Sequence, residues 1–282
     1  MQGLLVDLSE AQTRLRRRAY RSPAIIEHAD ALAKLEALIS VRPRVVVLGE
    51  SNAGKTSLIN LLLHEAIVPE SVIANTRRPL VLRYAEKARL IGITCNGITD
   101  LTAGDSWQDD TSTITRLLAC MPNPRLTAFD LVDTPALSAP KQLPAVELQP
   151  TDLLLWCTAA TQAWKESERR LWMSIPRRHH RHAILVATHR DHLRDDDAVR
   201  KVCTRLAAET AGCFRSIVLV CASSCGGAGT GQRGGSGVAE LDDRIAESLC
   251  AIAQRRHVAG YRLANHILRK ALTCIERPSA AA

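Results

Sequence analysis

Aromatic side chains are scarce in this 282-residue chain, at 3% of all residues, although hydrophobic residues make up 46%. A core of ordinary size must therefore be built mainly from Leu, Ile, Val and Ala. The chain also lacks any run near the roughly 18 consecutive apolar residues that a membrane-spanning helix needs. Its first ten residues lack the basic-then-apolar order of a secretory signal. We therefore expect a globular protein that stays in the cytoplasm.

The cysteine pattern does not indicate a disulfide framework. The chain has nine cysteines, an odd number, and several lie inside apolar runs, as reduced thiols of an intracellular protein do. Cys221 and Cys225 are the closest pair, but no second close pair and no suitably spaced His accompanies them, which argues against a zinc site. Acidic residues are outnumbered, and the net charge of +8 fits an acidic partner such as a nucleotide, nucleic acid or anionic lipid.

Short apolar runs recur along the middle of the chain, and helical patterns lie between many of them. Runs buried on both faces are typical of a parallel sheet, whose crossover helices cover both sides. Helices are expected near 107–120, where Ser106 and Asp109 have capping-box spacing, and near 166–175 and 196–210. The alternation predicts an α/β fold with a doubly wound, mostly parallel sheet. The apolar runs are 45–48, 80–82, 90–93, 129–132, 153–156, 184–187 and 217–220.

Four segments are predicted along the chain. Residues 1–42 form an N-terminal helical segment, 43–225 the α/β domain, 226–237 a Gly-rich linker, and 238–282 a C-terminal helical segment. The terminal segments have no obvious place in the sheet, so we expect their apolar faces to pack together. The apolar face of the N-terminal segment consists of Ile25, Ala29, Leu32, Leu35 and Ile39.

The strongest motif follows the first apolar run. Residues 49–56 match the phosphate-binding pattern GxxxxGK[ST] at every fixed position, between a predicted strand and a predicted helix. Its glycines let backbone amides turn inward around an anion, and the helix N-terminus adds unpaired N–H groups. Lys55 is expected to reach the β- and γ-phosphates, and the Thr56 hydroxyl to bind Mg²⁺. The predicted nucleotide-binding residues here are Gly49, Glu50, Ser51, Asn52, Ala53, Gly54, Lys55, Thr56 and Ser57.

Two further residues are candidates for the metal. Thr76 lies in a polar loop just before a predicted strand, where a Thr can close over Mg²⁺ and the γ-phosphate. Asp133 ends an apolar strand, a costly place for a carboxylate unless something uses it. A water-mediated contact to Mg²⁺ would be such a use. The predicted metal site therefore combines Thr56, Thr76 and Asp133.

Candidates for contact with the nucleotide base follow two later strands. Thr188, His189 and Asp191 come directly after one apolar run, and Ala222 and Ser223 after the last. The Asp191 carboxylate could accept hydrogen bonds from guanine N1–H and the 2-amino group, which adenine lacks. A backbone amide near Ala222 and Ser223 could reach guanine O6. Ligands of doubly wound sheets bind at the carboxyl ends of the strands, and all of these segments are placed there.

These segments resemble the bacterial dynamin-like GTPases. Residues 49–60 are similar to the phosphate loop of that group, and residues 76–82, Thr-Arg-Arg-Pro-Leu-Val-Leu, look like its switch segment. The resemblance covers about residues 44–225 and implies a P-loop NTPase fold that hydrolyses GTP to GDP with Mg²⁺. It also implies a helical bundle formed from segments before and after the GTPase domain. Ala136 stands where the family has the Gly of Asp-x-x-Gly, and His189 where its base motif has Lys.

The same resemblance suggests how hydrolysis is assisted. Ser51 stands where dynamins often have a catalytic Gln, and Asn52 matches an Asn that binds K⁺ in related GTPases, so activation by a monovalent cation in a homodimer across the nucleotide site is expected. Leu137 stands where Ras-type GTPases carry a water-orienting Gln. We therefore expect slow intrinsic turnover that self-association or a partner accelerates. The predicted catalytic residues are Lys55, Thr76, Ser51 and Asn52.

The partner is left open by the sequence. The chain is short for the stalk and membrane paddle of full-length dynamins, so a protein partner could supply a stalk. Basic clusters near the two ends could bind an anionic inner membrane face or RNA, as in an Era-like ribosome-associated GTPase, or be solvated helix faces. A degenerate GTPase that binds nucleotide and acts as a scaffold is a further alternative. The basic clusters are Arg14, Arg16, Arg17, Arg18 and Arg21, and Arg255, Arg256, Arg262, Arg269 and Lys270.

One histidine-rich segment has two interpretations. His179, His180 and His182 lie among three arginines just before a predicted strand. A metal site is conceivable, but the pattern favours a solvated basic loop.

Overall fold

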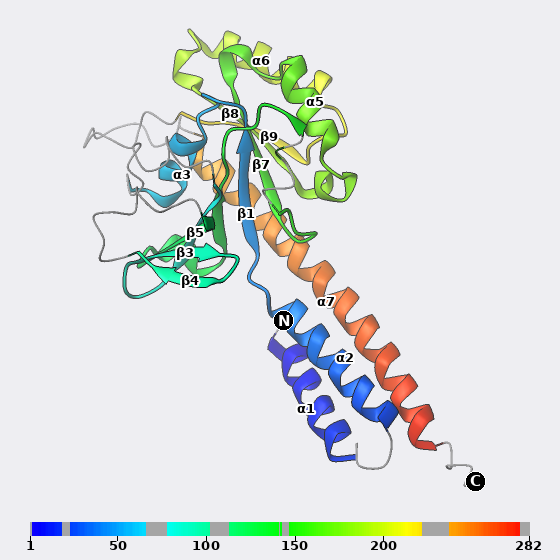
Figure 1. Cartoon of the computed structure of the whole chain (residues 1–282). Coiled ribbons are helices and arrows are strands. Elements are labelled where there is room, and N and C mark those ends of the chain that lie inside the picture. Colours follow the sequence, from blue (N-terminus) through cyan, green and yellow to red (C-terminus); the bar gives the residue numbers. More distant parts are fainter. Residues whose placement is uncertain are drawn as a thin grey trace. The chain divides into compact units, whose positions relative to one another are not determined.

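The computed structural model of the chain describes residues 2–18, 23–65, 78–101, 113–140, 142, 147–221 and 237–276. The chain divides into two compact units: a helical unit of Met1–Arg42 with Leu249–Ala282, and an α/β unit of Pro43–Ser248 (Figure 1). Among the helices of the described residues, none is both long and apolar enough to cross a membrane.

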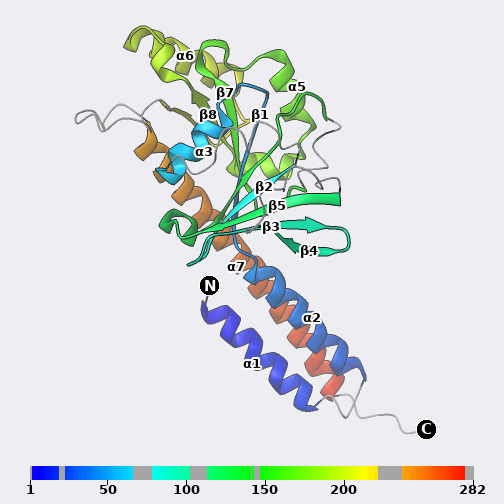
Figure 2. The ribbon, with the colours of Figure 1, turned by 60° about the vertical axis from the view of Figure 1, so that its left-hand side comes forward.

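The α/β unit is built on a nine-stranded sheet with the order β4-β3-β5-β2-β6-β1-β7-β8-β9. The five strands from β6 to β9 in this order are parallel, and β2 is antiparallel to β6 but parallel to β5. Strands β3, β4 and β5 pair antiparallel at one end (Figure 2). The predicted α/β, mostly parallel class is thus confirmed. The strands are β1 Arg44–Gly49, β2 Leu80–Tyr84, β3 Arg89–Thr94, β4 Gly97–Asp100, β5 Ile114–Met121, β6 Asp130–Asp133, β7 Leu153–Ala159, β8 Ile184–Thr188 and β9 Ser216–Leu219.

The helix predicted near 107–120 is wrong over its described part, because Ile114–Met121 is strand β5. Its buried residues Ile114, Leu117 and Met121 recur at intervals of three and four, which is the spacing of a helix face. Pairing with β2 on one side and β3 on the other gives the segment two sets of hydrogen bonds as a strand, and this tertiary context overrides the local pattern. Residues 107–112 lie outside the described part of the chain.

Helices cover the central strands on both sides. The helices α3 (Lys55–Leu63) and α5 (Glu166–Ser174) lie on opposite sides of β1 in Figure 1, and Leu206 of α6 (Asp196–Glu209) shares a core cluster with Leu171 and Trp172 of α5. Four of the nine aromatic residues cluster at α5: Trp156 and Trp172 meet edge to face at 5.6 Å, Phe214 stacks on Trp172 at 4.2 Å, and Trp164 meets Phe214 edge to face. A low aromatic content therefore still gives one concentrated aromatic cluster, set in an aliphatic core.

The phosphate-loop helix α3 is held at its C-terminal end by the segment between β5 and β6. The Asn123 Nδ2 donates to the carbonyl of Leu63 at 2.9 Å, and Arg125 Nε donates to that of Leu62 at 2.7 Å. The last carbonyls of a helix lack partners within the helix, so these two side chains satisfy them. Arg125 also pairs with Asp242 in the part of α7 (Val238–Glu276) that belongs to this unit.

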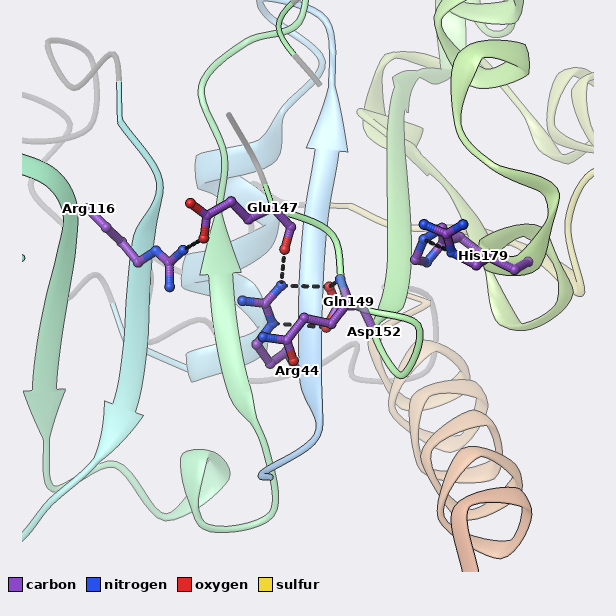
Figure 3. A network of polar contacts seen from close by, with 7 residues as sticks. Arg44, Arg116, Glu147, Gln149, Asp152 and His179 are labelled. Atoms are coloured by element: carbon purple, nitrogen blue, oxygen red, sulfur yellow. Dashed lines mark hydrogen bonds and ion pairs between the residues drawn. The ribbon is translucent and has the colours of Figure 1, made fainter. Parts of the chain in front are cut away.

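A buried ion pair fixes the start of β1. Arg44 donates through Nε and Nη2 to the two carboxylate oxygens of Asp152 at 2.9 and 2.6 Å, and Nη2 also reaches the carbonyl of Glu147 at 3.0 Å (Figure 3). The Gln149 amide donates to the same carboxylate, and the Glu147 side chain pairs with Arg116 on β5. The segment that leads from β6 to β7 is therefore anchored to the sheet at its far end.

The helical unit packs α1 (Gln2–Arg18), α2 (Pro23–Ser40) and residues 249–276 of α7 around an aliphatic core. All five residues of the predicted N-terminal face are buried, and Ala264, Ile267 and Ala271 of α7 join them. The α7 helix continues through Gly260, where an added Cβ would lie 2.4 Å from Ile39 Cδ1. A glycine here lets α7 approach α2 closely.

One member of the C-terminal basic cluster has a structural role in this unit. The Arg256 guanidinium donates to the carbonyls of Leu38, Ile39 and Val41 at 2.9, 2.6 and 2.8 Å. These carbonyls lie at the C-terminal end of α2, where helical partners run out and a positive charge is favourable. Arg256 is therefore a C-terminal cap of α2.

Candidate functional site

The phosphate loop connects β1 to α3, and its backbone requires glycine at both ends. Gly49 has φ +152° and Gly54 φ +79°. A Cβ on Gly49 would lie 2.6 Å from the Cys157 carbonyl oxygen, and one on Gly54 2.8 Å from Thr188 Oγ1. Asn52, at φ 60°, takes the left-handed conformation that Asn tolerates better than most residues. The loop is thus pressed against the ends of β7 and β8.

Lys55 is the first residue of α3 and lies folded over this loop. Its Nζ donates to the carbonyls of Glu50 at 2.7 Å and Gly49 at 3.2 Å. Burial lowers the pKa of Lys55, and the nearby Cys157, Asp133 and Glu50 act in the opposite direction. A half-buried ammonium on a loop of this geometry is suited to a phosphate chain.

Asp133 is buried at the end of β6 with one carboxylate oxygen, Oδ1, that has no hydrogen-bond partner. Burial raises its pKa to about 6, although the Lys55 charge and a backbone hydrogen bond from Thr134 lower it. An unpartnered buried carboxylate oxygen costs free energy unless a cation or a water on a cation uses it. The donor set of Asp133 and the Thr56 hydroxyl is therefore chemically suited to Mg²⁺, which prefers oxygen ligands and retains several waters.

The segment after Asp133 is attached to the phosphate loop. Thr134 Oγ1 donates to the Val47 carbonyl at 2.7 Å, and the Leu137 amide donates to that of Gly49 at 3.1 Å. Ala136 is exposed between these contacts, while the Leu137 side chain is buried in the main core. Leu137 therefore packs into the protein and does not face the site.

Thr188, at the end of β8, supports the phosphate loop through a side-chain hydrogen bond. Its side chain is fully buried, and Oγ1 lies 2.9 Å from the Ala53 carbonyl and 3.2 Å from that of Thr158. The sequence predicted that Thr188 lies at the nucleotide base. The geometry gives it a contact with the phosphate loop.

Of the other residues predicted to contact the nucleotide base, Asp191 lies on a short 3-10 helix, Arg190–His192, after β8, and His189 is the N-cap of that helix. His189 has φ 57° and stacks on His192, with ring centroids 5.2 Å apart. The Asp191 side chain is about one third exposed (31%), and its Oδ2 lies 3.7 Å from His192 Nε2. The ligand atoms of these three residues all lie within 4.8 Å of one another, so they could also hold a metal ion. Thr76, Ala222 and Ser223 lie outside the described residues.

The sequence did not predict the buried hydrogen-bonded pair of Thr158 and Glu168, which lies next to Thr188. Thr158 Oγ1 at the end of β7 donates to Glu168 Oε2 at 3.0 Å, and Glu168 also accepts from the Lys165 amide at 2.9 Å. Burial raises the pKa of Glu168. The only signal in the sequence was the position of Glu168 three residues after Lys165, at the start of a predicted helix.

The histidine-rich segment is not the solvated loop that its sequence favoured. Residues Arg177–His182 form a 3-10 helix in which His179 and His182 are buried. Arg178 Nε donates to His179 Nε2 at 3.2 Å, and burial and the Arg178 charge lower the pKa of His179. Trp172 stacks on His180 of this segment, while the three arginines remain exposed; the local charge pattern did not indicate the buried histidines.

Comparison with known proteins adds three findings. A sequence model described as the Dynamin family matches residues 45–190, about half of the chain. Dynamin-like protein 2 of Campylobacter jejuni subsp. jejuni serotype O:23/36 (strain 81-176) is 29% identical over 133 residues, which cover 44% of this chain and 22% of that relative. The match therefore spans less than a quarter of that protein.

Solved structures of an oligomerised bacterial dynamin pair, described with long-range sensing and tethering of membranes, have a similar fold. One chain matches 96% of this chain with a TM-score of 0.64 at 15% identity, and another matches 97% with the same TM-score at 16% identity. This chain covers 56% and 47% of those two chains, about half of their length.

Proposed function

Because this chain belongs to the dynamin family, we propose that it binds GTP with Mg²⁺ and hydrolyses it to GDP and phosphate. One observation carries the proposal: Lys55 lies over a glycine-ended phosphate loop, next to the unpartnered buried carboxylate oxygen of Asp133. A Gly-rich turn with a stray Lys would need no buried carboxylate beside it.

The chain's own residues have distinct roles in this proposal. The amides of residues 49–57 and the Lys55 ammonium bind the phosphates and stabilise the charge that develops as water attacks the γ-phosphate. Thr56, Thr76 and Asp133 would hold Mg²⁺, which supplies further neutralisation of phosphate charge. Thr188 and the Thr158–Glu168 pair keep the loop in place.

Guanine selection is proposed to rest on Asp191. Its partly exposed carboxylate is able to accept from N1–H and the 2-amino group. His189 occupies the position of the family's Lys and lies parallel to His192, and amides near Ala222 and Ser223 would reach O6.

We propose slow hydrolysis in the isolated chain. Leu137 is buried in the core, so this position offers no side chain that orients water. Ser51 and Asn52 are exposed on the phosphate loop and are accessible to a second copy. A homodimer across the nucleotide site, with K⁺ at Asn52, would complete the site.

The cellular setting is proposed by analogy. The solved relatives are a bacterial dynamin pair that tethers membranes. A peripheral place at the inner membrane face, with a protein partner that supplies a stalk, is proposed by the same analogy. The exposed arginines of the terminal helices would face the anionic lipid.

A single-turnover assay tests hydrolysis. Enzyme in excess over γ-labelled GTP should release phosphate when Mg²⁺ is present, and Lys55→Ala should abolish that release. If the nucleotide binds but stays intact over many hours, in dimer-forming conditions and with K⁺, the chain is a nucleotide-binding scaffold and not a hydrolase.

A further inference from the structure

A cavity lies next to the segments that lead into β8 and β9, at the end of these strands away from the phosphate loop. It has a volume of about 570 Å³, which is within the usual range of small-molecule sites. Three segments form it: the end of α5, the 3-10 helix Arg177–His182 before β8, and the turn before β9. The residues that matter for its chemistry are Met173, Arg177, His180, Arg181, Phe214 and Arg215.

This cavity is separate from the nucleotide site. The strand β8 begins next to it at Ile184, where the Arg215 amide donates to the Ala183 carbonyl, and ends at Thr188 on the phosphate loop. Five residues of strand span roughly 16 Å. A ligand in the cavity would therefore not touch Lys55.

The cavity is positively charged. Arg177, Arg181 and Arg215 are exposed at its lining, and none of its described lining residues carries a carboxylate. Within the described residues, none of these three guanidinium groups forms an ion pair or a side-chain hydrogen bond. Elsewhere in this unit Arg44, Arg83 and Arg125 each bind a carboxylate. Three unneutralised guanidinium groups around one cavity raise the local concentration of anions.

The walls between these charges are aromatic and apolar. Trp172 stacks on His180 at 4.5 Å and on Phe214 at 4.2 Å, so two lining rings are fixed by one buried indole. Burial and the Arg177 charge lower the pKa of His180, and its Nε2 lies 3.0 Å from the Ile175 carbonyl. The His180 ring is thus held in the wall by its stacking on Trp172 and its contact with the Ile175 carbonyl. The Met173 side chain adds an adaptable apolar surface.

We propose that this cavity binds an organic phosphate, with the phosphate on the guanidinium groups of Arg177, Arg181 and Arg215 and the apolar part against Phe214 and Met173. Arg presents a planar set of donors that matches phosphate oxygens in pairs. A purely inorganic anion would leave the apolar walls uncovered. The phosphate can come from a soluble ester or from a phospholipid head group.

Calorimetry with phenyl phosphate tests the site directly. The full chain carrying Lys55→Ala is used, so that the phosphate loop does not compete. We expect binding that R181Q/R215Q weakens at least tenfold. Arg89→Gln, at an exposed position of strand β3, carries the same type of charge change away from the cavity and should have no effect.

Two further measurements make the result unambiguous. The variants should keep the circular dichroism and urea midpoint of the parent, since all three arginines are exposed. Binding to phosphatidylglycerol vesicles but not phosphatidylcholine vesicles, lost in R181Q/R215Q, would identify a lipid head group, and binding of phenyl phosphate alone a soluble ester. The proposal is overturned if neither probe binds, if Arg89→Gln weakens binding equally, or if an acidic peptide binds and phenyl phosphate does not.

Discussion

At the scale of single residues, Asp133 shows the conflict between stability and function most clearly. It is buried, its Oδ1 lacks a partner, and its pKa is raised to about 6. The unfolded chain releases this proton near the ordinary value of 3.8, so the free energy of unfolding falls as pH rises from about 4 to about 6 and is level above. A buried carboxylate that lowers the free energy of unfolding in this way is expected where it interacts with a cation.

Asp133→Asn is predicted to stabilise the nucleotide-free protein and to weaken nucleotide binding in Mg²⁺. The stabilisation at pH 7.5 should reach up to about 3 kcal/mol, and roughly 1 kcal/mol of it should appear between pH 5 and pH 7.5. Urea unfolding of the parent and the variant at the two pH values measures the difference in their free energies of unfolding. The contributions of other titrating groups cancel in this difference. An advantage for Asn that is the same at both pH values would contradict this account of Asp133.

Arg44 provides a second test at this scale. Arg44→Met leaves Asp152 buried without its partner and is predicted to cost about 3–5 kcal/mol of unfolding free energy. Arg116→Met breaks the neighbouring pair with Glu147, whose carboxylate is largely exposed, and should cost less than about 1 kcal/mol. Urea denaturation compares the two. Equal losses would mean that burial does not determine the strength of these pairs.

At the scale of elements, helix ends are completed by side chains from distant segments. Asn123 and Arg125 bind the last carbonyls of α3, and Arg256 those of α2. Such contacts join residues 60 or more positions apart in the chain, so local sequence patterns do not predict them. Arg256 was part of a basic cluster considered for an acidic partner, and its contacts within the helical unit explain why one of these arginines is needed.

Arg256→Gln is predicted to destabilise the protein by about 1–3 kcal/mol, because the carbonyls at the end of α2 lose charged donors. Arg255 is its exposed neighbour on α7, and Arg255→Gln makes the same change in charge with an expected effect below about 0.5 kcal/mol. Thermal unfolding of the two variants measures this. If Arg255→Gln is the more harmful change, the capping role of Arg256 is wrong.

At the scale of the whole molecule, much of the α/β unit was predictable because its signals are local. The run 45–48, the glycines at 49 and 54 and the helix after Lys55 each indicate their structure within a few residues, and the fold class is confirmed. Strand β5 was mistaken for a helix because its buried residues have helical spacing and only its two neighbours make it a strand. Thr188 and the Thr158–Glu168 pair support the loop through contacts across strands, which the order of residues does not reveal.

Turnover is predicted to depend on association between copies. Phosphate release per molecule should rise with protein concentration and be faster in K⁺ than in Na⁺, since Leu137 is buried and Asn52 is exposed on the loop. Steady-state assays over a hundredfold range of concentration measure this. A rate per molecule that stays constant, in a sample that light scattering finds monomeric throughout, would exclude activation by self-association.

Calorimetric titration with GDP, a non-hydrolysable GTP analogue and ATP in the presence of Mg²⁺ tests the central claim most directly. We expect both guanine nucleotides to bind, ATP to bind more weakly, and Lys55→Ala to weaken guanine nucleotide binding at least tenfold, or by about 1.4 kcal/mol. Absence of heat from every guanine and adenine nucleotide, or binding that Lys55→Ala leaves unchanged, would contradict a phosphate-binding role for residues 49–56.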